Sequence, residues 1–238
     1  STIGSRCAPA WSWQARRDGL SPSMKWIAAS YNEALSNTLN NDRRKLVESP
    51  DLRALMGTDT RLAKGQRNVS LFLNRDRGFM QATAPGGGAT GYHAHRHIYD
   101  DLVKPKDVTA VGLKAAADFL TKTMSSRFVD QSRESKALIA QRLGIGDPND
   151  IFAEMHPDCV RLTVPALYDP KRSCVTIRHG VEWRDPRTAA GESFEPHRYP
   201  AEILQKKRLM LGAAFEAQYQ QQPVKEGGTL IKVAKFQR

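Results

Sequence analysis

The sequence is poor in cysteine and contains no long apolar segment. Cys7, Cys159 and Cys174 are the only cysteines in 238 residues, and no two of them form a C-x-x-C pair. Neither a disulfide framework nor a thiolate zinc site is expected, which suits a reducing cytosol. No apolar run approaches the roughly 20 residues that span a bilayer, and the first residues lack a signal-peptide layout. We therefore expect a soluble, cytoplasmic protein with no membrane partner.

A phosphate-binding G-x-x-x-x-G-K-[ST] loop is also missing from the sequence. The three glycines at 86–88 follow a predicted strand without a G-K-[ST] continuation, so a flexible connection before the acidic strand is favoured over a phosphate-cradling loop. The chain opens with Ser1 and Thr2 rather than Met, and we expect the natural start to lie upstream.

Acidic residues are outnumbered by basic ones. The chain carries 36 Lys and Arg against 25 Asp and Glu, a formal net charge of +11. Such a surplus favours a polyanionic partner, because basic side chains that contact phosphates release condensed counterions. Nucleic acid is the natural hypothesis, and a basic protein without a special partner is the alternative.

Apolar periodicity indicates an α/β fold with a mainly parallel sheet, because predicted strands alternate with predicted helices. One domain and a tail are expected at this length. Asn32 offers an N-cap for a helix that Pro50 stops, and Asp147 with Pro148 suits another helix start. The predicted strands are 25–30, 68–74, 79–83, 95–99, 137–141, 160–164 and 174–177; the predicted helices are 2–17, 32–48, 111–124 and 201–222, the last broken near Gly212.

The strongest chemical signal is a strand that runs into two carboxylates, Asp100 and Asp101, in HIYDDLVKP. In nucleotide hydrolases one acid at such a strand end holds Mg²⁺ through water, while a neighbouring carboxylate orients or deprotonates the attacking water. An ordinary Asp-Asp turn after a strand is the alternative.

Two other groups of polar residues have open readings. The side chains of His93, His95 and His97 share one face of an extended segment, where they could chelate a divalent metal or simply face a polar groove. Gln141 and Arg142 follow a predicted strand at the edge where open α/β sheets bind ligands, so Gln141 could sense a γ-phosphate and Arg142 could stabilise its charge. A strand that simply ends in polar residues is the alternative.

Four segments occur in an order that resembles phage terminase large subunits across nearly the whole chain: WIAASYNEALSNTLNNDRRKLVESP, GGGATGYHAHRHIYDDLVKPKDV, SSRFVDQSRESKALIAQRLGIGDPNDIF and FEAQYQQQPVKEGGTLI. The resemblance implies a P-loop NTPase-like three-layer fold. It implies a motor domain over residues 1–222 and, from 223 to 238, the start of a linker toward a nuclease domain.

The resemblance also implies site residues and partners. IYDD becomes the Walker B segment, with Asp100 on the magnesium side and Asp101 as the carboxylate that activates water. Ser1 and Thr2 look like the residues just past the Walker A lysine, and they would bind nucleotide together with Gln141 at the end of a coupling strand. Arg142 would be catalytic, and either it or Arg127 could serve as the arginine finger.

The activity implied is ATP hydrolysis, with Mg²⁺ and ATP as cofactors, that moves double-stranded DNA into a procapsid. The implied partners are a terminase small subunit, a portal protein and further copies of the chain in a ring, at the procapsid portal in a bacterial cell. Without the Walker A lysine, we expect little ATP turnover from this chain alone. The alternatives are a helicase-like ATPase and a degenerate remnant that only binds DNA. Arg43, Arg44 and Lys45 are expected to form a solvated helix face rather than a DNA contact.

Overall fold

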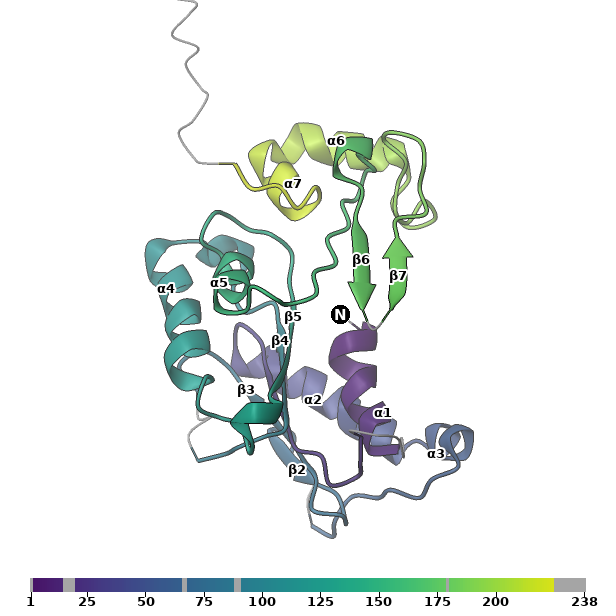
Figure 1. Cartoon of the computed structure of the whole chain (residues 1–238), viewed down its shortest axis with the longest axis vertical. Helices are drawn as coiled ribbons and strands as arrows, with labels where there is room; N and C mark the ends of the chain where they lie inside the picture. Colours follow the sequence, from purple (N-terminus) through teal and green to yellow (C-terminus); the bar gives the residue numbers. More distant parts are fainter. Residues whose placement is uncertain (1, 15–19, 66–67, 88–90, 179, 225–238) are drawn as a thin grey trace, which may run out of the picture. The chain divides into compact units, whose positions relative to one another are not determined.

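The computed structural model describes residues 2–14, 20–65, 68–87, 91–178 and 180–224 (Figure 1). The chain divides into two units, residues 1–140 and 141–238, and each is described by itself. The predicted boundary at residue 222 stays a prediction, because the segment that follows it lies almost wholly outside the described residues.

A five-stranded sheet in the order β2-β3-β1-β4-β5 forms the centre of the first unit. β1, β3, β4 and β5 are parallel, and β2 pairs antiparallel with β3 as a hairpin. The strands are β1 (Trp26–Ala29), β2 (Leu71–Leu73), β3 (Phe79–Thr83), β4 (Arg96–Asp100) and β5 (Ser135–Ile139). The predicted α/β class with a mainly parallel sheet is confirmed, and the predicted hairpin lies where the sequence placed it.

Helices of the first unit lie on both faces of this sheet. Ile98 of β4 packs in the core beneath α1 and α2, whereas Tyr99 contacts Phe119 of η3 on the other face, with ring centroids 6.4 Å apart. In Figure 1, α1 and α4 accordingly lie on opposite sides of the sheet. The helical elements are η1 (Thr2–Cys7), α1 (Ala8–Gln14), α2 (Glu33–Glu48), α3 (Pro50–Met56), η2 (Pro105–Asp107), α4 (Ala110–Asp118), η3 (Phe119–Thr123) and η4 (Gln131–Arg133).

Local capping explains where α2 begins and ends. The Asn32 side chain accepts a hydrogen bond from the Leu35 amide at 2.9 Å, so the predicted N-cap is confirmed. α2 ends at Glu48, but Pro50 does more than stop it. Pro50 occupies the first turn of α3, which Ser49 caps, because a helix start has no use for the amide that proline lacks.

The core of the first unit forms where α1 and α2 meet the sheet. Trp13 is fully buried, stacks edge-on against Phe72 at 5.8 Å and donates its indole N–H to the Met24 carbonyl at 2.7 Å. Val47, Met80 and Ile98 complete the same cluster. Burial of each large apolar side chain stabilises the fold by about 1.5–3 kcal/mol.

The second unit is built from short elements: α5 (Pro148–Met155), η5 (Pro170–Arg172), β6 (Val175–Arg178), β7 (Val181–Arg184), α6 (Ala201–Leu211) and α7 (Ala213–Gln218). β6 and β7 form a two-stranded hairpin. The predicted break at Gly212 is confirmed by its φ of 52°. The strand predicted at 160–164 is wrong: the segment finds no partner strand, and Leu162 is exposed, so the apolar alternation has no sheet to support it.

No helix among the described ranges is both long and apolar enough to cross a membrane.

Candidate functional site

Four parallel strands of the first unit end at one edge of the sheet, which we call the carboxyl edge. The chain leaves β1 toward β3 on one side and leaves β4 toward β5 on the other. The connections therefore diverge between β1 and β4, and open α/β sheets bind ligands outside the strand ends at such a point. The two strands meet this point with Asp100 as the last residue of β4, Asp101 directly after it, and Ser30 and Tyr31 directly after β1. The topology therefore predicts a ligand site at these residues.

Asp100 ends β4 and is only 4% exposed. Side chains alternate along a strand, so it lies on the same face as Ile98, toward α1 and α2. η1 packs against β4 on that face, which brings the first described turn of the chain to the strand that carries Asp100. No described residue donates a hydrogen bond to the Asp100 carboxylate. A buried carboxylate of this kind needs a cation nearby.

Arg43 supplies a positive charge near Asp100. The expectation that it forms part of a solvated face is wrong, because Arg43 is 2% exposed. Its guanidinium donates to the Ser5 carbonyl at 2.6 Å, to the Ser5 hydroxyl at 3.2 Å and to the Asn40 side chain at 3.2 Å. Burial lowers the pKa of Arg43 to about 10, while the Asp100 charge acts in the opposite direction. Lys45 is exposed and Arg44 partly so, as expected.

Asp101 has a left-handed backbone, with φ at 51°. A non-glycine residue pays about 1–3 kcal/mol for a sparsely populated conformation of this kind, which persists only where the surroundings impose it. Here both neighbouring strands do so. The Asp101 amide donates to the Ile139 carbonyl of β5 at 2.9 Å, and its carbonyl accepts from the Tyr31 amide after β1 at 2.9 Å. The turn at the carboxyl edge is thereby held between the ends of two strands.

The end of β3 is tied to the same edge by a serine. The Ser36 hydroxyl accepts from the Ser30 amide at 2.9 Å and donates to the Thr83 carbonyl. The Thr83 hydroxyl is buried and finds no hydrogen-bond partner within the described part of the chain. Lys104 places its ammonium 4.3 Å from the centre of the Tyr31 ring. The carboxyl edge thus combines an unsatisfied hydroxyl, a cation and two carboxylates in a rigid frame.

His95, just before β4, and His97, within it, both form hydrogen bonds with protein groups. His97 is buried, its ring nitrogens lie 3.0 Å from the Tyr99 hydroxyl and 2.9 Å from the Arg127 carbonyl, and it stacks on Phe128 at 3.9 Å. Burial lowers its pKa to about 4. His95 accepts from the Lys25 amide at 3.0 Å, and burial lowers its pKa as well. These contacts explain how so polar a strand occupies the interior of the sheet.

The residues of the carboxyl edge fit a magnesium ion with few protein ligands. No group of three or more His, Cys, Asp or Glu side chains in the described ranges is arranged to hold a metal ion. Mg²⁺ keeps most of its waters and commonly takes one or two carboxylates together with substrate phosphates. The single buried carboxylate of Asp100 meets that requirement, whereas a zinc site with closed protein coordination does not fit.

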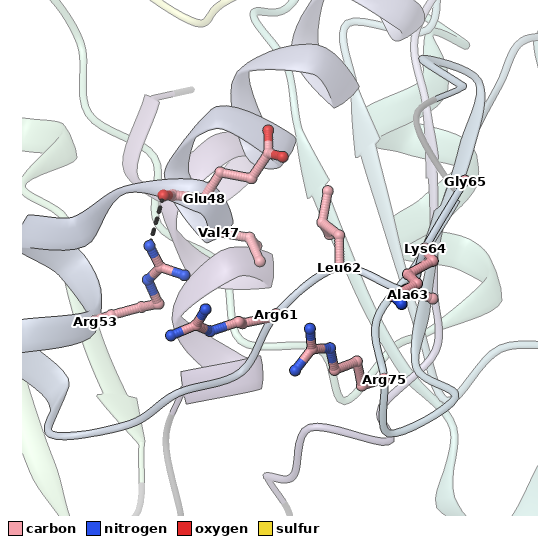
Figure 2. Close-up of a pocket in the computed structure, with 9 residues that line it drawn as sticks. All are labelled: Val47, Glu48, Arg53, Arg61, Leu62, Ala63, Lys64, Gly65 and Arg75. Carbon is pink, nitrogen blue, oxygen red and sulfur yellow. Dashed lines mark hydrogen bonds between the residues drawn. The ribbon is translucent and has the colours of Figure 1, made fainter.

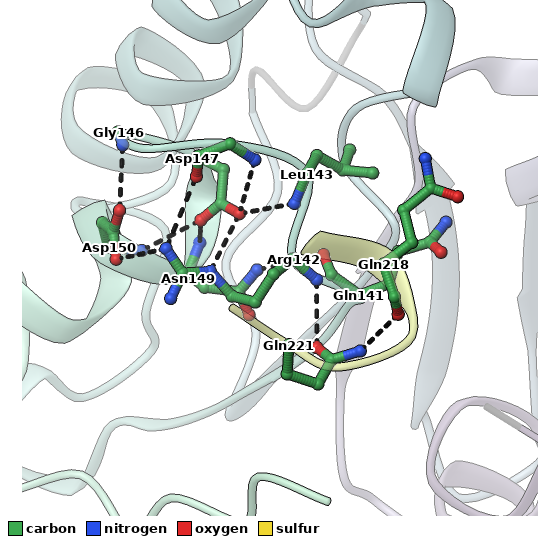
Figure 3. Close-up of polar contacts among 10 residues, drawn as sticks. Gln141, Arg142, Leu143, Gly146, Asp147, Asn149, Asp150, Gln218 and Gln221 are labelled. Atoms are coloured by element: carbon green, nitrogen blue, oxygen red, sulfur yellow. Dashed lines mark hydrogen bonds and ion pairs between the residues drawn. The ribbon is translucent and has the colours of Figure 1, made fainter. Parts of the chain in front are cut away.

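Gln141 and Arg142 begin the second unit (Figure 3). β5 ends at Ile139, two residues earlier than predicted, so Gln141 lies beyond the strand. The Arg142 guanidinium donates to Asp147 at 3.0 Å and to Asp150 at 2.7 Å. Asp147 is completely buried and also caps α5, accepting from the Asn149 amide at 3.0 Å. Arg142 therefore has a structural task in this loop, and a catalytic one would require its release from two carboxylates.

Two glutamines of the QYQQQP segment form hydrogen bonds with backbone groups elsewhere in the second unit. Gln220 is buried and bonds to both backbone groups of Leu167, accepting from the amide at 2.9 Å and donating to the carbonyl at 3.1 Å. Gln221 accepts from the Arg142 amide at 3.0 Å (Figure 3). The side chains of Gln220 and Gln221 thus take the place of backbone hydrogen-bond partners for Leu167 and Arg142.

The three remaining predicted residues lie at the start of the chain or at the amino edge of the sheet. Ser1 lies outside the described residues, and Thr2 is described only as the first residue of η1. Arg127 precedes Phe128, which bridges to Ala94 ahead of β4. It therefore lies at the amino edge of the sheet, away from Asp100 and Asp101.

Sequence reasoning missed Arg43, Ser36 and Tyr31 at the carboxyl edge. A usable signal existed for two of them. Ser36, Leu39, Arg43 and Val47 recur at intervals of three and four residues, which places them on one helix face. The RRK run concealed that periodicity, because a cluster of basic residues usually marks an exposed face.

The chain matches no protein-family model, and no curated protein shows a significant match to it.

Proposed function

We propose that the chain is the ATPase motor region of a phage-type terminase large subunit, with a P-loop NTPase-like fold, that uses ATP hydrolysis to move double-stranded DNA into a procapsid. The observation that carries the proposal is the position of Asp100 and Asp101. The buried Asp100 ends the β4 strand at the point where the chain connections diverge, and Asp101 follows it on a constrained turn. Nucleotide hydrolases divide metal binding and water activation between two such acids.

The residues would act as follows. When bound, ATP supplies the phosphoryl group, and Mg²⁺ neutralises the negative charge of its phosphates. Asp100 holds the metal side of the site, and Arg43 balances the carboxylate from within the protein. Asp101 orients and accepts a proton from the attacking water, and its backbone bonds to Tyr31 and Ile139 fix its position. Gln141 remains a candidate for sensing the γ-phosphate, and the coupling between phosphate release and movement would pass through β5.

The test uses the protein encoded by the complete open reading frame, with DNA-stimulated ATP turnover as the measurement. Asp101→Asn should lower kcat by about 100-fold or more, the usual contribution of a positioned general base, with little change in KM. Asp100→Asn should raise the Mg²⁺ concentration required for half-maximal turnover. Asp107→Asn, an exposed acid in the same unit, is the matched control and should leave both unchanged. Unchanged turnover in Asp101→Asn would remove the role assigned to that residue.

A DNA-binding chain without catalysis is the second candidate. It is favoured by the distribution of charge: the first unit, residues 1–140, holds 21 basic and 13 acidic residues, whereas residues 141–238 hold 15 basic and 12 acidic residues. Salt-dependent DNA binding without any Mg²⁺-dependent ATP turnover in the complete protein would select this candidate over the motor.

A further inference from the structure

A basic hollow lies at the amino edge of the sheet, opposite the carboxyl edge (Figure 2). It has a volume of about 530 Å³ and lies between the end of α2, α3, the loop at 61–65 and the β2–β3 turn. Its charged lining consists of Arg53, Arg61, Lys64 and Arg75, with Glu48 as the one acid among the lining residues described. Figure 2 shows the guanidinium groups of the three arginines along one side of the hollow.

Hydrogen bonds to the backbone hold together the segments that carry these basic side chains. The Arg75 amide donates to the Arg61 carbonyl at 3.0 Å, and the Ala63 amide donates to the Leu73 carbonyl at 2.9 Å, so the loop runs beside β2. Arg53 donates to the Glu48 carbonyl at 3.2 Å from the first turns of α3. The fold therefore brings together the segments that carry these side chains.

The positive charge in the hollow is incompletely neutralised. Asp59 pairs with Arg61 at 2.6 Å, but both side chains are more than half exposed. Such a pair contributes little free energy, so Arg61 can exchange Asp59 for another anion at low cost. The Glu48 carboxylate pairs with Arg44 at 3.6 Å, outside the lining. The described residues provide no ion-pair partner for Lys64 or Arg75. The pKa of Asp59 is lowered first by Arg61 and then by the charges of Arg53 and Arg75, so all three guanidinium groups lie close enough to act on the same carboxylate.

We propose that this amino-edge hollow holds the sugar-phosphate backbone of double-stranded DNA. Arginine forks bind phosphate oxygens in pairs, and the hollow presents three of them. None of the described lining residues is aromatic, whereas proteins that bind single strands stack the bases on aromatic rings. The same lack of a stacking surface argues against a mononucleotide. A duplex backbone, which offers phosphates and hides its bases, fits this lining.

The inference deepens the proposed function and relies on the DNA partner that this function requires. The hollow and Asp100 lie at opposite ends of the strands, and a five-residue strand is roughly 15 Å long. DNA contact and phosphate chemistry would then occupy separate edges of one sheet, so substitutions can test one without disturbing the other.

The experiment compares two triple variants of the 238-residue chain by fluorescence anisotropy with a labelled 30-base-pair duplex. Arg53→Gln, Arg61→Gln and Arg75→Gln together remove three charges from the hollow. Lys106→Gln, Lys114→Gln and Lys122→Gln remove three charges from exposed positions in and around α4, on the other side of the first unit (Figure 1). Circular dichroism and thermal melting check that both variants are folded.

The hollow variant should bind the duplex about 10-fold more weakly, and the slope of log K against log salt should fall by about 2–3, close to one unit for each lost phosphate contact. The lysine variant should keep the wild-type slope. Equal losses in the two variants would overturn the placement of the DNA surface and leave the proposed function standing. Failure of the wild-type chain to bind DNA would overturn both. Equal or tighter binding of a single strand, with the same sensitivity, would overturn the commitment to a duplex.

Discussion

Replacement of Arg43 by methionine is the most informative test of the buried charges in the first unit. Methionine fills a similar volume but removes three hydrogen bonds, two to Ser5 and one to Asn40. It also removes a positive charge that interacts electrostatically with the buried Asp100. Leaving a buried polar group without its hydrogen-bond partner typically costs about 1–3 kcal/mol, so the loss of these three hydrogen bonds should cost about 3–5 kcal/mol in total. We expect Arg43→Met to destabilise the first unit by that amount.

Arg44→Met is the matched control. Arg44 is the next residue of the same helix, and it bonds only to Asn41 and Glu48 on a partly exposed face. A pair of this kind is worth about 0.3–0.5 kcal/mol. Urea unfolding monitored by circular dichroism measures both variants on the same scale. A difference of less than about 1 kcal/mol between them would refute the reasoning, since the cost is attributed to burial and not to loss of an arginine.

A second substitution separates charge from packing. If the cost arises from the Asp100 charge, Asp100→Asn in the Arg43→Met background should recover part of the lost stability, giving a coupling free energy of about 1–3 kcal/mol. If the cost arises from lost packing alone, the two effects should add without recovery.

Three further predictions concern single residues. The pKa of His97 is about 4 in the folded state against 6.5 in the unfolded chain. Between these two pH values the unfolded chain binds more protons, so the free energy of unfolding should fall by up to about 3 kcal/mol as the pH drops from 6.5 toward 4. In urea titrations at several pH values, His97→Phe should flatten this dependence and His93→Gln should not. Gly78→Ala should lower the melting temperature by several degrees, because its Cβ would lie 2.2 Å from the Pro22 carbonyl oxygen; an unchanged melting temperature would contradict the close packing described. Asp147→Ala should destabilise the second unit by about 2–4 kcal/mol, because the helix cap of α5 and the ion pair with Arg142 are lost together. If calorimetry measures a loss of stability under about 1 kcal/mol, the loop does not depend on the Asp147 side chain.

Much of the local structure was predictable from residues close together in the chain. Asn32 and Asp147 cap helices that begin one residue later, as expected from side chains that reach amides two or three residues ahead. The turn between β2 and β3 forms because Asn74 accepts from the amides of Asp76 and Gly78. Strand 160–164 failed as a prediction because a strand requires a partner elsewhere in the chain.

The candidate site divides in the same way. That Asp100 and Asp101 follow a strand could be read from apolar patterning and the turn-forming residues after it. That Asp100 is buried beside Arg43, or that Asp101 adopts a left-handed backbone between Tyr31 and Ile139, depends on residues far away in sequence.

Local sequence was sufficient to predict the alternation of helices and strands and many of their caps and turns, because these depend on side chains and amides within a few residues of one another. The excess of positive charge follows from the composition alone. Contacts between distant parts of the chain set the strand order, bury Arg43 and His97, and bring Arg53, Arg61 and Arg75 to one hollow. Polar side chains can occupy the interior of a sheet only when distant parts of the chain supply hydrogen-bond partners and opposite charges. The local sequence does not indicate whether the fold provides such partners.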